Sequence, residues 1–193
     1  MTTARPRRRA DAQRSIAAIV AAARAQLAAN PDASVEDIAR AAGVGRQTLY
    51  GHFRTRAELL DATLADALAE GEKTLSGLDL DGDADEALTM LLGSSWALVA
   101  ESAALLTAAQ PVLSAERIRE LHTAPAQRLT ALVHRGRDQG VIRTDMPVQW
   151  QVNLVHYVLH GAAVELRAGR LHAEQIPAVV TATIRSALRP DPA

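Results

Sequence analysis

The sequence contains no cysteine, and this absence removes several classes of protein at once. A disulfide scaffold, a thiolate metal site and a cysteine nucleophile are all excluded. Aromatic residues make up only 3% of the 193 residues, so the core must consist mainly of alanine, leucine, valine and isoleucine. The arginine-rich start is not followed by the apolar segment of a secretory signal, and no uninterrupted apolar run is long enough to predict a membrane span. We therefore expect a cytoplasmic protein with no membrane contact.

Lysine is nearly absent as well, and the charges that remain are unevenly distributed. Residues 1–56 contain ten arginines and four acidic residues, a net charge of +6, although the whole chain carries only −1. The rest of the chain has eleven basic and eighteen acidic side chains, a net charge of −7. A basic end on an acidic body indicates that this end binds a polyanion. Chance clustering in an arginine-rich composition is the alternative.

The pattern of apolar residues predicts an all-α protein of about nine helices. Ile16, Val20, Ala23 and Leu27 follow the spacing of one helical face, and no segment alternates with the period of a strand. The helices are expected at residues 11–29, 35–42, 46–53, 55–75, 85–103, 105–110, 114–139, 147–168 and 173–188, with a kink or break at Pro125 in the seventh. Residues 76–86, rich in glycine and aspartate, are expected to form an exposed linker.

The segment GVGRQTLYGHF, residues 43–53, contains a tight turn at residues 43–45 and the second of two short helices. Ser34 and Asp37 form a capping box that begins the first of them, and Gly43 is placed to end it in the left-handed conformation. A second capping box, Thr55 to Glu58, begins the long helix that follows. Two short helices joined by a tight glycine-containing turn predict a helix-turn-helix, a unit that presents its second helix to DNA.

The exposed side of that second helix carries side chains suited to DNA. Arg46 can bond guanine O6 and N7, and Gln47 can pair with adenine N6 and N7. Thr48, Tyr50 and His52 can donate to phosphate oxygens, as can the helix end at Ser34 and the guanidinium of Arg56. Arginines 5, 7, 8 and 9 are expected to form a basic, flexible arm that contacts DNA or remains solvated.

The segment SVEDIARAAGVGRQTLYGHFRTRAELL resembles the N-terminal signature of the tetracycline-repressor (TetR) family of bacterial transcription regulators. The resemblance implies a DNA-binding domain over residues 1–55 and a helical ligand-binding and dimerisation domain over residues 56–193. It also implies DNA contacts at Ser34, Arg46, Gln47, Thr48, Tyr50, His52 and Arg56. Gly45 stands where the family often has a serine cap, Gln47 where it commonly has glycine, and Arg56 where it usually has lysine.

The last two long helices are the candidates for a homodimer, for which the resemblance implies a four-helix bundle. The residues predicted for the interface lie on one apolar stripe of each helix: Val152, Val155, Leu159, Ala163, Val180 and Ile184. A role in the core of a single subunit is the alternative for this stripe.

A small-molecule effector is expected to bind in the helical body, among aliphatic side chains with a few polar ones. The candidate contacts are the unusual residues of that region: Met90, Trp96, His122, Asn153, His156 and Tyr157. His156 and His160 have the spacing of two metal ligands on a helix, but no third ligand accompanies them, so neither a metal nor another cofactor is expected.

Together these features predict a ligand-responsive regulator, most simply a repressor that binds a palindromic operator as a dimer and leaves it on binding the effector. One alternative is an architectural protein that binds nucleic acid without sequence preference. The other is an enzyme that uses the helical body, but no nucleophile, phosphate-binding or dinucleotide motif supports catalysis.

Overall fold

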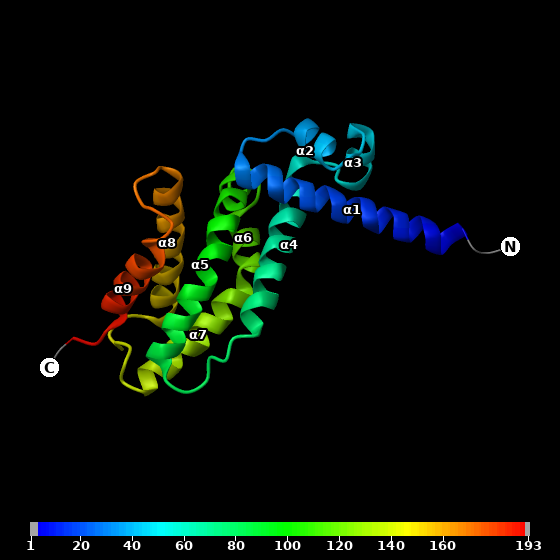
Figure 1. Cartoon of the computed structure of the whole chain (residues 1–193). Helices are drawn as coiled ribbons and strands as arrows, with labels where there is room; N and C mark the ends of the chain where they lie inside the picture. Colours follow the sequence, from blue (N-terminus) through cyan, green and yellow to red (C-terminus); the bar gives the residue numbers. More distant parts are fainter. Residues whose placement is uncertain (1–3, 192–193) are drawn as a thin grey trace. The chain divides into compact units, whose positions relative to one another are not determined.

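The computed structural model describes residues 4–191, with side chains from residue 10 onward, and the chain is mainly helical over that range (Figure 1). The helices are α1 (Ala4–Ala29), α2 (Val35–Ala41), α3 (Arg46–His52), α4 (Arg56–Ser76), α5 (Ala84–Ala109), α6 (Ala115–Leu121), α7 (Thr123–Asp138), α8 (Val148–Arg167) and α9 (Ile176–Leu188). No strand occurs among residues 4–191, which confirms the predicted all-α class with nine helices.

The chain packs into two compact units. Unit 1 comprises residues Met1–Ala69 and Ala104–Leu121, and unit 2 comprises Glu70–Ala103 and His122–Ala193. Helices α4 and α5 therefore contribute residues to both units. The division predicted at residue 55 was based on function, whereas these boundaries follow packing: two fall inside α4 and α5, and the third lies between α6 and α7.

The core of unit 1 is made by helices α1 to α4 together with the last turn of α5. Ile19 and Leu27 of α1, Ile38 of α2, Leu49 of α3 and Leu64 of α4 are almost completely buried in it. Burying aliphatic surface of this kind is the main favourable contribution to folding. Each short helix thus directs one face inward, and the other face of α3 is left to solvent.

Helix α1 differs from the prediction in two respects. It begins at Ala4, so arginines 5, 7, 8 and 9 belong to the first turns of a helix and not to a flexible arm. Ile16, predicted on the buried stripe, is 39% exposed, whereas Ala23 and Leu27 are buried as expected. Only the part of α1 from Ile19 onward packs on the core of unit 1, so the buried stripe does not extend to Ile16.

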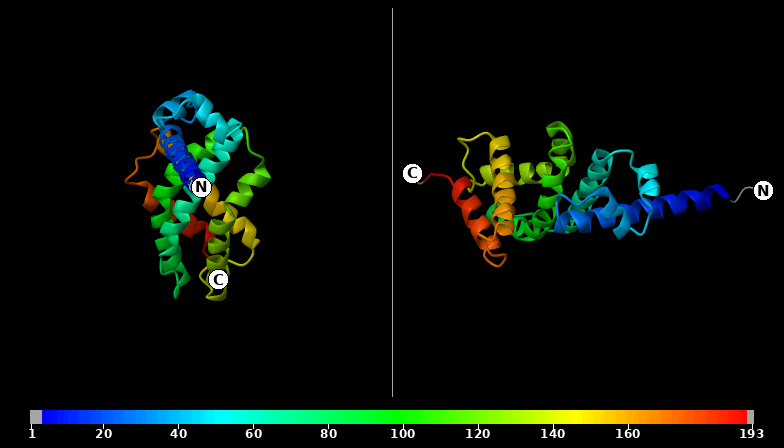
Figure 2. Two further views of the ribbon diagram at one scale, coloured as in Figure 1. Left: turned by 90° about the vertical axis from the view of Figure 1, so that its right-hand side faces the viewer. Right: turned by 90° about the horizontal axis from the view of Figure 1, so that it is seen from above.

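The core of unit 2 is a separate aliphatic cluster. Leu92 of α5, Val133 of α7, Val155 of α8 and Ile184 of α9 are among its members. Helices α8 and α9 are neighbours within it, and the right-hand view of Figure 2 shows them side by side. The linker between α4 and α5 is fixed to the same unit, because the side-chain amide of Gln139 donates to the Gly82 carbonyl at 2.9 Å and accepts from the Ala84 amide at 2.8 Å.

Helix α5 is continuous, which corrects the prediction of two helices separated near residue 104. The buried face changes at that point, since Trp96 and Ala103 lie in the core of unit 2 while Leu105 and Ala109 lie in the core of unit 1. No glycine or proline interrupts this stretch, so the helix itself continues. By length and composition α5 could cross a membrane, but core helices of folded domains share that property.

The break between α6 and α7 lies at His122 and not at Pro125, where the sequence predicted it. Pro125 is the third residue of α7. The first backbone N–H groups of a helix have no intrahelical acceptor, so a proline in the first turn removes no intrahelical hydrogen bond.

Candidate nucleic-acid interface

The turn between α2 and α3 has the geometry that the sequence predicted. Gly43 has a φ of 67°, the left-handed region in which glycine has no steric penalty. The amide of Val44 donates to the Ala39 carbonyl at 3.0 Å and closes the end of α2. Gly45 is extended and its carbonyl accepts from Leu49 at 3.1 Å, so α3 begins at once with Arg46.

The start of α2 is a complete capping box. The Ser34 hydroxyl accepts from the Asp37 amide at 3.1 Å, and Asp37 Oδ2 accepts from the Ser34 amide at 3.3 Å and from the Ser34 hydroxyl at 2.6 Å. These hydrogen bonds from Ser34 lower the pKa of Asp37 below its usual value. The hydroxyl proton of Ser34 is therefore directed to Asp37, and a phosphate at this helix end would have to compete for it.

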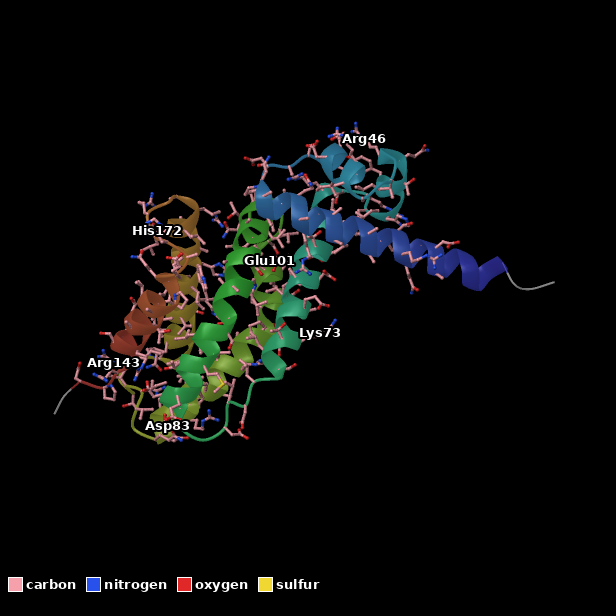
Figure 3. All side chains as sticks on the ribbon, in the orientation of Figure 1. Arg46, Lys73, Asp83, Glu101, Arg143 and His172 are labelled. Carbon is pink, nitrogen blue, oxygen red and sulfur yellow. The ribbon has the colours of Figure 1, made fainter. Side chains whose placement is uncertain are left out.

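Helix α3 separates its residues by face. Leu49 is buried and Phe53, which follows the helix, is buried beside it. Arg46, Gln47 and Thr48 are exposed, Tyr50 is 37% exposed and His52 is half-buried. Figure 3 shows Arg46 on the side of the α2–α3 pair that faces away from α1. The predicted base-reading and phosphate-binding side chains of α3 are thus accessible, apart from the half-buried His52.

Arg46 has two partners on that surface. Its Nη1 lies 2.6 Å from Oε1 of Glu36, which belongs to the first turn of α2. Its guanidinium also lies over the ring of Tyr50, 5.4 Å from the centroid, a cation–π arrangement. Glu36 was missed by the sequence analysis, because its approach to Arg46 depends on how the two helices cross.

Arg56 is engaged within unit 1. Its Nη1 donates to the Ala33 carbonyl at 2.7 Å, and its Nη2 lies 3.5 Å from the Pro31 carbonyl, so the side chain ties the start of α4 to the loop before α2. The predicted capping box at this helix forms in altered register. Thr55 Oγ1 accepts from the Glu58 amide at 3.1 Å, but the Glu58 carboxylate accepts from the Arg54 amide at 2.7 Å instead of from Thr55.

Comparison with known proteins agrees with this geometry. Residues 19–63, which include the capping box, the turn and all of α3, match the family described as bacterial regulatory proteins, tetR family. This stretch of the chain is therefore similar to the N-terminal, DNA-binding part of tetR-family regulators. No match is found among the curated proteins.

Solved structures extend the likeness to most of the chain. The transcriptional regulator FadR from Bacillus subtilis, in complex with stearoyl-CoA, has a TM-score of 0.72 at 18% identity and covers 89% of this chain and 98% of its own. LfrR from Mycobacterium smegmatis, in complex with proflavine, has a TM-score of 0.71 at 22% identity, with coverage of 91% and 97%. A TetR-family regulator from Agrobacterium tumefaciens has a TM-score of 0.72 at 20% identity, with coverage of 92% and 99%. These likenesses show the TetR-family fold over both units.

The residues predicted to bind a ligand occupy different places in unit 2. Trp96 is in the core, whereas Met90 and Tyr157 are on the surface, the latter with 64% exposed. Asn153 accepts from Gln149 Nε2 at 3.0 Å on the flank of α8. His122 and His156 belong to a histidine cluster completed by His160, whose ring meets that of His122 edge to face at a centroid distance of 6.4 Å.

Two of the three histidines in this cluster have a lowered pKa. Burial, and to a smaller extent the nearby His122, His156 and Arg167, lower the pKa of His160 to about 4. Burial and the nearby His122 also lower the pKa of His156. Among the described residues, no group of three or more histidines and carboxylates is arranged to hold a metal ion.

The side chains predicted for the dimer interface are buried within their own subunit, which is a correction. The six are Val152, Val155, Leu159, Ala163, Val180 and Ile184, and each is at most 4% exposed. Helices α8 and α9 each have a buried and an exposed apolar face, and the sequence prediction placed the dimer interface on the buried face. The exposed apolar face of α8 carries Trp150, Tyr157 and Val164, spaced by seven residues, and Val179 is exposed on α9.

Proposed function

We propose that this chain is a ligand-responsive, DNA-binding transcription regulator of the TetR family that acts as a repressor. The observation that carries the proposal is the exposed face of α3, where Arg46, Gln47, Thr48 and Tyr50 stand together on a helix-turn-helix. Exposed arginine, amide and hydroxyl groups at the start of such a helix are the groups that read and hold DNA. Among residues 10–191, no comparable set of groups supports an enzymatic role.

The proposed DNA contacts fall into two groups, those to base edges and those to phosphates. Arg46 and Gln47 are proposed to read base edges in the major groove, and Thr48, Tyr50 and His52 to hold phosphates. Ser34 and Arg56 are proposed as further phosphate contacts, each of which must share its donors with the partners that it has in the protein.

A homodimer is proposed because two copies of one helix-turn-helix read the two halves of a palindrome. The exposed stripe of Trp150, Tyr157 and Val164, with Val179 beside it, is the surface of unit 2 suited to a second copy. Large apolar side chains gathered on one exposed face are typical of an interface. The chain is proposed to work in the bacterial cytoplasm, where operator DNA is found.

A small-molecule effector is proposed to bind unit 2 and to reduce DNA affinity. FadR and LfrR were solved with stearoyl-CoA and proflavine, so these two compounds are reasonable first probes. Contacts are proposed among Met90, Trp96, His122, Asn153, His156 and Tyr157. The effector must bind the DNA-free state more tightly, and a shift from 99:1 to 1:99 needs a preference of about 5.5 kcal/mol.

Selection from a random duplex library tests the DNA proposal. The purified chain should enrich a palindromic sequence with half-sites about one helical turn apart. Enrichment of no sequence, with equal affinity for random DNA and strong salt dependence, would instead identify an architectural nucleic-acid-binding protein. Loss of the complex on adding an effector would establish the response to ligand.

Sedimentation tests the dimer surface. Tyr157→Glu places a charge in the proposed interface and should yield monomers at micromolar concentration with the helical content unchanged. Val112→Glu, at an exposed apolar residue of unit 1, is the matched control and should leave the dimer intact. A monomeric parent protein, or dissociation by both variants, would refute this surface.

A further inference from the structure

The Glu36–Arg46 ion pair joins a carboxylate to the arginine that is proposed to read a base. The two side chains come from different helices, meet at 2.6 Å and remain 45% and 64% exposed, respectively. An ion pair this exposed contributes little to folding stability, because water and salt screen it. Capping does not require Glu36 either, since Asp37 makes the reciprocal bonds with Ser34.

The pair does restrict what Arg46 can contact. A guanidinium has five N–H donors, and Glu36 takes one of its edges while the Tyr50 ring lies against its face. The donors that remain can still form a two-bond contact with a guanine edge. A phosphate oxygen, by contrast, would compete with Glu36 for the same charge and would be repelled by that carboxylate.

We propose that Glu36 is a specificity-determining residue of the DNA interface. It holds Arg46 against Tyr50, ready for a base edge, and withholds it from phosphates, so that DNA of the wrong sequence is bound more weakly. The inference rests on the proposed function, in which the exposed face of α3 binds DNA. Glu36 thereby weakens non-specific binding, and specificity requires weak binding of wrong sequences as well as tight binding of the right one.

Affinity measured over a range of salt concentrations tests the role of Glu36. The probes are a duplex selected by the parent protein and a random-sequence duplex of equal length. Glu36→Gln should bind the random duplex about threefold more tightly and steepen its salt slope by about 0.9, because Arg46 then neutralises one more phosphate. The selected duplex should gain less, so the ratio of the two affinities falls.

Asp32→Asn is the matched control, since Asp32 carries the same charge in the exposed turn just before α2. It should leave the salt slope as in the parent. In an Arg46→Ala background, Glu36→Gln should no longer change the slope. Equal effects of the Glu36 and Asp32 substitutions on both duplexes would overturn the inference and leave a general charge effect. A parent protein that selects no sequence would refute the proposed function itself.

Discussion

The two faces proposed to bind DNA and a second copy, the exposed side of α3 in unit 1 and the exposed side of α8 in unit 2, differ in how they are specified. The α3 face lies within a stretch of about ten residues whose glycine, caps and apolar pair fix its orientation locally. The α8 face depends on which side of the helix α5, α7 and α9 cover. A locally determined surface can be derived from sequence, and a surface determined by distant packing cannot.

The largest expected effect comes from the buried face of α9. Ile184→Ala should lower the free energy of unfolding by about 2–5 kcal/mol, because Ile184 is completely buried in unit 2. Ser186→Ala, at an exposed position of the same helix, should change it by less than about 0.5 kcal/mol. Both tryptophans belong to unit 2, so urea unfolding followed by tryptophan fluorescence reports this unit. Equal effects of the two variants would mean that the faces are assigned wrongly.

The next largest expected effect is a dependence of the stability of unit 2 on pH. The folded-state pKa of His160 is about 4, below its usual value, so the unfolded chain binds more protons between that pKa and about pH 6.5. Unit 2 should therefore be fully stable above about pH 6.5 and lose stability as the pH falls toward 4, by at most about 3 kcal/mol. His160→Gln should reduce this slope in urea titrations, whereas His134→Gln, at an exposed site on α7, should leave it unchanged. A slope unaffected by His160→Gln would refute the burial of a neutral imidazole.

The smallest expected effect tests whether the orientation of α3 depends on the glycine in the turn before it. Gly43→Ala should destabilise the helix-turn-helix by about 1 kcal/mol, because alanine is strained at a φ of 67°. Gly51→Ala, inside α3 with open space where the added Cβ would lie, should be neutral or stabilising. Hydrogen exchange of the α2 amides in the full chain measures both. Protection unchanged in Gly43→Ala would show that the turn does not depend on glycine.

Much of unit 1 could be predicted from sequence because its signals are local. The Ser34 cap, the left-handed Gly43 and the buried Leu49 and Phe53 all follow from neighbours within a few residues. The Glu36–Arg46 contact could not be predicted in this way, since it requires the crossing of two helices. For the same reason the engagement of Arg56 with a preceding loop was not foreseen.

In unit 2 the helices were predicted but their roles were partly misassigned. An apolar stripe such as Val152, Val155 and Leu159 shows that one face is covered, and it does not show whether the same subunit or a partner covers it. The continuity of α5 was missed because its buried face changes from one core to the other. Which faces of the helices meet is set by contacts between distant parts of the chain.

The affinity of an Arg46→Ala, Tyr50→Ala double variant for the selected duplex tests the central claim most directly. We expect affinity to fall at least about 100-fold, to the level of the random duplex, because a base contact and a phosphate contact are both lost. Hydrogen-exchange protection of α2 and α3 should remain, since both side chains are exposed. Unchanged affinity and selectivity in a folded double variant would contradict the assignment of this face to DNA.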